Sequence, residues 1–201
     1  MSTVIYIVLI VILVIIVLAN IAPKVYDVSR SISINRPLPE VFSYLKFLKN
    51  QDNWSPWTEK DPNVKKTFSG IDGEVGFVSA WVGNKAVGKG EQEITGIVEN
   101  EVVNAQLRFL KPFKSTSDAY LKVEKDDNGT KVTWGFSGKN KFPMSMIMLF
   151  VNMDKTVGKD FEYGLNKLQK ILEGEIKSKE MVGFIKLFEG VFYKGIPKSE
   201  R

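Results

Sequence analysis

The sequence predicts an α+β protein: a curved antiparallel sheet of about seven strands wrapped around a long C-terminal helix, preceded by one N-terminal transmembrane helix. Three observations support this prediction. An apolar run opens the chain, residues 64–140 show successive strand patterns separated by turn residues, and a helical apolar pattern then runs to Gly174. A long amphipathic helix that follows a curved sheet is expected to bury its apolar stripe against the concave face.

The composition excludes several classes of chemistry. The chain of 201 residues has no cysteine and no histidine, so it forms no disulfide, no thiolate nucleophile and no Ser-His-Asp triad. The net charge of +5 is spread along the chain, with no arginine-rich block. Proteins that bind nucleic acid usually show a concentrated basic stripe. We therefore expect no nucleic-acid partner, and no metal or other cofactor.

Residues 1–23 are predicted to be a transmembrane anchor. The apolar run at 4–22, at about 1.5 Å per residue, spans roughly 30 Å as a helix, which is the thickness of a bilayer core. A cleaved signal peptide is the alternative, since Val17-Leu18-Ala19 resembles a cleavage site, but no Lys or Arg precedes the run. The first charges follow the run, so the positive-inside rule predicts a single-pass membrane protein with its soluble domain in the cytoplasm.

Residues 24–174 are expected to form one domain. Residues 25–35 alternate apolar and polar side chains as a strand does, and a helical period follows over 36–50, with Pro39 in the first turn. The Trp-Ser-Pro-Trp segment at 54–57 is expected to be a loop. Strands are then predicted at 64–70, 76–83, 86–100, 101–112, 115–126 and 129–138.

The long helix carries an apolar stripe that Asp154 interrupts. The stripe consists of Ile147, Phe150, Val157, Phe161, Leu165, Leu168 and Leu172. Asp154 is either a buried carboxylate with a raised pKa that orients a ligand, or the N-cap of a helix that begins there. Gly158 and Gly164 lie in the same helix, and they either allow close approach to the sheet or leave room for a ligand.

Residues 175–201 are expected to form an amphipathic tail helix. Its apolar positions follow i, i+3, i+4, i+7 spacing from Met181 to Phe192, and lysines flank them. The helix, over about residues 176–193, is expected either to lie on the membrane or to pack against protein, because its apolar face is too large to remain in water.

Five segments carry a family resemblance: SISINRPLPEVFSYL (31–45), WSPWTEKDPN (54–63), VGKGEQEIT (87–95), GTKVTWGFSG (129–138) and FPM…MDKTVGKDFEYGLNKL (142–168). In these segments the chain resembles the START-like, or SRPBCC, superfamily and its helix-grip fold, and within it the membrane-anchored bacterial proteins of the polyketide cyclase/dehydrase and lipid transport group. The resemblance implies a cavity between sheet and helix for a hydrophobic or lipid-like small molecule. The superfamily also includes cyclases and chaperone activators, so it implies the fold more narrowly than the function.

The candidate ligand-binding residues are those expected to line or border this cavity: Trp54, Trp57, Phe77, Trp81, Trp134, Phe136, Asp154 and Phe161. Aromatic rings suit apolar ligands, but core packing explains the same rings, and both interpretations stay open. Glu91 and Glu93 lie on one face of a strand about 7 Å apart, a spacing similar to that of a glycosidase pair. A solvated outer face shared with Lys89 also explains them.

Three functions are compatible with these patterns. The first, which we favour, is a membrane-tethered, non-catalytic binding protein for a hydrophobic small molecule or lipid, and we assign no catalytic residue. The second is a cyclase- or hydrolase-type enzyme, which requires Asp154 or the pair of Glu91 and Glu93 to point into the cavity. The third is a protein-interaction module of the chaperone-activator type, which requires a filled core.

Overall fold

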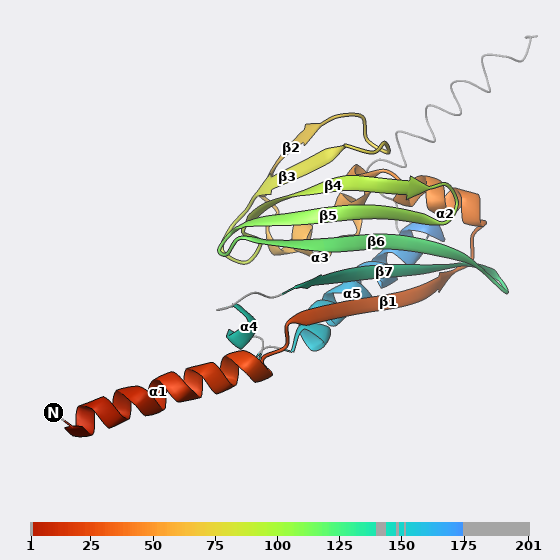
Figure 1. Cartoon of the computed structure of the whole chain (residues 1–201). Helices are drawn as coiled ribbons and strands as arrows, with labels where there is room; N and C mark the ends of the chain where they lie inside the picture. Colours follow the sequence, from red (N-terminus) through yellow and green to blue (C-terminus); the bar gives the residue numbers. More distant parts are fainter. Residues whose placement is uncertain (1, 140–143, 148, 151, 175–201) are drawn as a thin grey trace, which may run out of the picture.

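The computed structural model describes residues 2–139, 144–147, 149–150 and 152–174 and has the predicted architecture (Figure 1). The strands are β1 (Val25–Ile34), β2 (Lys65–Ser69), β3 (Val78–Val82), β4 (Lys89–Val98), β5 (Val102–Lys111), β6 (Ser115–Asp126) and β7 (Gly129–Lys139). The helices are α1 (Ser2–Ile21), α2 (Leu38–Leu45), the 3₁₀ helix η1 (Leu48–Asn53), α3 (Pro56–Lys60), α4 (Met144–Ile147) and α5 (Met153–Leu172). The tail expected over 175–201 lies outside the described residues.

The strands form one antiparallel sheet of 7 strands in the order β1-β7-β6-β5-β4-β3-β2. Strands β2 to β7 follow one another as a meander, and β1 joins the free edge of β7. Helices α2 and α5 cover the concave face, while α1 projects away from the domain (Figure 1). This is the predicted curved sheet wrapped around a C-terminal helix.

The strand register defines two ends of the sheet, called here the α1 end and the far end. At the α1 end, Val25 of β1 pairs with Lys139 of β7, and Lys89 of β4 pairs with Lys111 of β5. The β3–β4 and β5–β6 connections therefore lie at the end where α1 enters the domain (Figure 1). The β4–β5 and β6–β7 connections lie at the far end, where Asn100 adopts a positive φ of 62° in the tight turn after β4.

The far half of the concave face holds the close-packed core. Buried apolar side chains from the sheet meet those of α2 and of the second half of α5. They are Ile34, Ile94, Val103, Leu121, Val123 and Val132 from the strands, Val41, Phe42 and Leu45 from α2, and Leu165, Leu168, Ile171 and Leu172 from α5. The α5 stripe predicted from sequence is confirmed from Val157 onward, because its helical spacing places these residues over the sheet.

The start of the long helix differs from the prediction. Helix α5 begins at Met153, so Ile147 belongs to the separate short helix α4 and Phe150 lies in the connection between them. A helix does begin near Asp154, but its N-cap is Asn152, whose side chain accepts a hydrogen bond from the backbone N–H of Lys155 at 2.9 Å. Asn152 has the extended backbone that a cap requires, whereas Asp154 already lies in the first turn.

The segment after β1 also differs in detail. The helix predicted over 36–50 ends at Leu45, because Phe47 adopts an extended conformation before η1 begins. Residues 54–57 do not form a simple loop: Pro56 begins the short helix α3, where a proline needs no backbone N–H. Trp54, which lies just before this helix, packs in the core, and only 1% of its surface is exposed.

An aromatic cluster marks the place where α3, α5 and β7 meet. Trp134 stacks on Phe161 with ring centroids 4.1 Å apart, and Trp54 meets the edge of Trp134 at 4.8 Å. Gly164 allows this approach, because a Cβ there would lie 3.0 Å from the Trp134 ring and 3.3 Å from Pro56. Of the two roles considered for Gly164, close packing against the sheet is the observed one.

Truncation of Trp54 should separate the packing of its ring from the polarity of its indole. We expect Trp54→Ala to lower the free energy of unfolding by about 3–5 kcal/mol, the range for a large buried aromatic. The Trp54 Nε1 has no hydrogen-bond partner among the described residues. Trp54→Phe loses no hydrogen bond and keeps an aromatic ring in place, so it should cost less than Trp54→Ala. Chemical unfolding in detergent, followed by circular dichroism, measures both values, and equal losses would contradict this account.

Candidate ligand-binding cavity

The half of the concave face nearest α1 is hollow. It encloses a cavity of about 600 Å³, bounded by the sheet, η1, α3 and the first turns of α5. The larger apolar side chains of its lining are Tyr26, Leu48, Trp57, Val64, Trp81, Val87, Leu107, Phe109, Phe113, Trp134, Phe136, Met153, Val157 and Phe161. Small-molecule sites in proteins typically measure about 300–1,000 Å³ and have mostly apolar walls. The filled core that an interaction module requires exists only at the far end.

The structure brings most of the candidate residues together. The five that line the cavity are Trp57, Trp81, Trp134, Phe136 and Phe161. Trp54 and Phe77 lie outside the lining, and each is only 1% exposed. Phe77 precedes β3 at the far end of that strand and stacks on Phe68, so it shares a strand face with Trp81 but belongs to the filled half of the domain.

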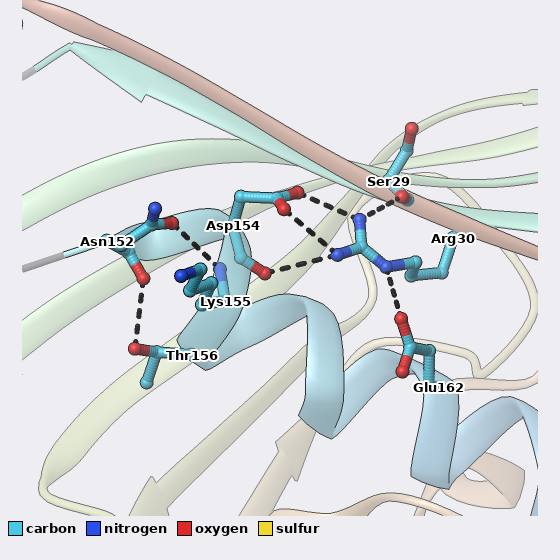
Figure 2. Close-up of polar contacts among 7 residues, drawn as sticks. All are labelled: Ser29, Arg30, Asn152, Asp154, Lys155, Thr156 and Glu162. Atoms are coloured by element: carbon cyan, nitrogen blue, oxygen red, sulfur yellow. Dashed lines mark hydrogen bonds and ion pairs between the residues drawn. The ribbon is translucent and has the colours of Figure 1, made fainter.

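Asp154 does not line the cavity, and the interpretation of a buried carboxylate with a raised pKa is wrong. Its side chain is 59% exposed and accepts a hydrogen bond from Nη1 of Arg30 at 2.8 Å (Figure 2). Nε of the same guanidinium donates to Glu162 at 2.6 Å. Because Arg30 donates to the carboxylate, the pKa of Asp154 lies below its usual range. Arg30, Asp154 and Glu162 together join α5 to β1 on the outside of the domain.

Gly158 serves this same contact. A Cβ at this position would overlap the guanidinium of Arg30, so the absence of a side chain lets Arg30 lie flat against α5. The helix and the edge strand β1 are thereby joined by charge-assisted hydrogen bonds as well as by apolar packing.

Glu91 and Glu93 also lie outside the cavity. Both face the convex side of β4, where Arg108 of the neighbouring strand binds them at 2.6 and 2.7 Å. The partner of the pair is Arg108 rather than Lys89. The enzyme hypothesis required Asp154 or this pair to point into the cavity. None of the three carboxylates does so. The alternation of β4 turns Glu91 and Glu93 outward, and Asp154 lies in the exposed first turn of α5.

Several polar residues of the cavity were not singled out from sequence. The hydroxyl of Tyr26 lies 2.6 Å from that of Ser117, and burial raises the pKa of Tyr26, so the phenol stays neutral. Lys66 reaches the cavity from β2 and is paired with Asp52 of η1. The alternation of β1 places Tyr26 on the same face as buried Val28, which is a usable sequence signal. The pairing of Asp52 with Lys66, by contrast, could not be predicted from any local sequence pattern.

Lys85 and Lys111 lie at the rim of the cavity, in the β3–β4 connection and at the end of β5. Neither forms an ion pair within the described part of the chain. The described residues also contain no group of three or more His, Cys, Asp or Glu side chains arranged to hold a metal ion. The cavity thus combines aromatic walls, a few neutral hydrogen-bonding groups and a basic rim.

Comparisons with known proteins agree with this geometry. A family model described as polyketide cyclase / dehydrase and lipid transport matches residues 26–173, nearly the whole domain. A search of curated protein sequences finds no significant match.

Solved structures share the helix-grip fold at low sequence identity. The di-domain ARO/CYC StfQ from the steffimycin biosynthetic pathway has a TM-score of 0.56 and 9% identity over 76% of this chain and 52% of StfQ. A protein from Thermobifida fusca has a TM-score of 0.53 and 17% identity over 76% of this chain and 95% of its own. The Aha1 dimer from Colwellia psychrerythraea has a TM-score of 0.51 and 16% identity over 74% of this chain and 96% of the Aha1 chain. Identities this low establish the fold alone.

The ion pair of Arg30 and Asp154 predicts a pH dependence. A lowered pKa means that the ionised carboxylate stabilises the fold above the pKa of the unfolded chain, and that this stabilisation is lost as the pH falls. We expect Asp154→Asn to lower the melting temperature near neutral pH, and to change it little only at an acid pH below the lowered pKa of Asp154, which itself lies under the usual value of about 4. Thermal unfolding at both pH values tests this, with the exposed neighbour Lys155→Gln as control. A melting-temperature difference between wild type and Asp154→Asn that does not shrink at acid pH would contradict the assignment.

Proposed function

Because the chain belongs to the polyketide cyclase/dehydrase and lipid transport family, we propose that it is a membrane-tethered protein that binds one hydrophobic or lipid-like molecule in this cavity without changing it chemically. The observation that carries the proposal is the half-filled concave face. Close-packed side chains occupy its far half, while about 600 Å³ remain open between aromatic walls at the α1 end. Interiors are normally packed without such space, so a cavity of this size supports ligand binding.

The lining favours an amphipathic molecule over a strongly polar one. Rings of Trp57, Trp81 and Phe136 offer large, rigid apolar surface, and burying an apolar ligand against them is favourable by about 25 cal/mol per Å². Tyr26 lines the cavity, and its hydroxyl, which already bonds to that of buried Ser117, can also bond to a ligand hydroxyl or carboxyl group.

The absence of catalysis is supported by the state of the ionisable groups. The carboxylate of Asp52, which lines the cavity, is neutralised by Lys66, and the acids considered as catalysts lie on outer surfaces. General acid–base catalysis needs a group within hydrogen-bond reach of the bound molecule, and Asp154, Glu91 and Glu93 do not line the cavity.

The tether is supported by helix α1. Among the described residues it is the one helix long and apolar enough to cross a bilayer, and no side chain of Thr3–Ile21 is buried. A signal sequence meets the same criterion, and the mass measurement described below distinguishes the two. Lys24 and later charges follow the helix, in keeping with a domain on the cytoplasmic side.

A cavity-filling substitution tests ligand binding. Ala119 of β6 lines the cavity, and Ala119→Phe places a ring inside it. We expect the affinity for a fluorescent fatty acid to fall at least about tenfold, a loss of about 1.4 kcal/mol. Thr116→Phe adds the same ring to the exposed face of the same strand and should bind as wild type does. Equal affinity of the two variants would overturn the proposed site.

The mass of the membrane-bound protein tests the tether. We expect the full chain to remain in the membrane fraction after an alkaline wash and to keep its N-terminal residues in intact-mass measurement. Recovery of a shortened chain that lacks residues 1–19 would show cleavage and would exclude an anchor, while leaving the cavity proposal standing.

A further inference from the structure

The α1 end of the sheet carries a basic surface around the mouth of the cavity. Exposed lysines come from the α1–β1, β3–β4 and β5–β6 connections and from the strand ends beside them: Lys24, Lys85, Lys89, Lys111, Lys114 and Lys139. None of them forms an ion pair within the described residues, so their charge is available to an external anion. Opposite, the turns of the far end carry Glu99, Glu101, Asp126 and Asp127, and the strand ends beside them carry Lys125 and Lys131.

The connection between α1 and β1 keeps this surface close to the end of α1. The N–H of Ala22 still donates to Leu18 at 3.0 Å, which leaves Pro23 and Lys24 as the link to β1. Two residues reach about 7 Å when fully extended. Figure 1 shows α1 leaving the domain at the end that carries the β3–β4 and β5–β6 connections, with α4 beside its last turn.

The basic surface also includes an aromatic side chain. Phe113, in the β5–β6 connection, is 58% exposed, contributes to the cavity wall and sits between Lys111 and Lys114. Aromatic and basic side chains together are the usual composition of surfaces that lie in the interfacial region of a bilayer. The far end has exposed apolar residues as well, but Ile71 and Val75, which are 66% and 62% exposed, adjoin Asp72 and Glu74 instead of lysines.

We propose that the α1 end of the sheet docks on the bilayer that α1 spans. Phe113 enters the interfacial region, the surrounding lysines contact anionic lipid head groups, and the cavity mouth opens onto the leaflet. A lipid can then pass between leaflet and cavity without exposing its chain to water. This inference rests on the proposed tether, and it adds the source of the ligand and the surface through which the ligand enters.

Because the chain has no cysteine, a single introduced thiol can be labelled at one site. Full-length Phe113→Cys, carrying an environment-sensitive fluorophore, is reconstituted into vesicles of phosphatidylcholine and phosphatidylglycerol. The expected result is blue-shifted emission that nitroxide-bearing lipids quench. The matched control is Ile71→Cys, an exposed apolar position at the far end, whose label should stay in water and remain unquenched.

The outcomes separate docking from its alternatives. Quenching at position 113 and none at position 71 supports docking. Emission at 113 that is blue-shifted but unquenched indicates contact with protein and overturns the proposal, as does water-like emission at both positions. Because the vesicles contain the inserted full chain in every case, a negative result here leaves tethering and ligand binding untouched.

Charge reversal tests the contribution of the lysines. In the Phe113→Cys background, Lys89→Glu with Lys114→Glu changes two lysines that do not line the cavity. We expect this variant to lose the quenching in vesicles with phosphatidylglycerol. In the chain with Phe113 intact, Lys89→Glu with Lys114→Glu should keep the wild-type affinity for the fatty-acid probe in detergent. Lys125→Glu with Lys131→Glu, at the far end, should keep the quenching. Unchanged quenching in the first variant would overturn the role of the basic surface.

Discussion

The stack of Trp134 on Phe161 is the contact on which the arrangement of this domain depends. It holds α5 against β7 at a ring separation of 4.1 Å, and Gly164 allows the close approach. On one side of the stack, the apolar residues of α5 and α2 fill the concave face down to the far end. On the other side, α5 presents only Met153 and Val157, and the face remains open as the cavity. The stack is therefore the floor of the cavity and the beginning of the core.

The positions of the charged groups follow from this division. Acidic side chains that looked functional in sequence are bound by arginines on outer surfaces, Asp154 by Arg30 and Glu91 by Arg108. These contacts hold the edge strand to the helix and one strand to the next, where partial exposure lowers the cost of charge. The six lysines of the α1 end, by contrast, form no ion pair within the described residues, so they take no part in these structural contacts.

Much of the fold was predictable because it depends on local patterns. All six strands of the meander and the first strand lie where period-2 alternation and turn residues place them. The limits of short helices were not predictable. The chain turns at Phe47, Pro56 and Asn152, where the backbone conformation is selected by burial of neighbours such as Trp54 rather than by helical period. Of the eight candidate site residues, those on strands near α1 line the cavity, but nothing local distinguishes Phe77 from Trp81.

The sequence by itself determined the fold class, the apolar N-terminal helix and the absence of histidine and cysteine chemistry, because these follow from composition and periodicity. The tertiary structure alone decided which half of the concave face is filled and which carboxylates point outward. It also decided that the cavity mouth, the lysines and α1 share one end of the sheet. These properties depend on strand register and on the depth at which α5 packs, and both are set by contacts between residues far apart in the chain.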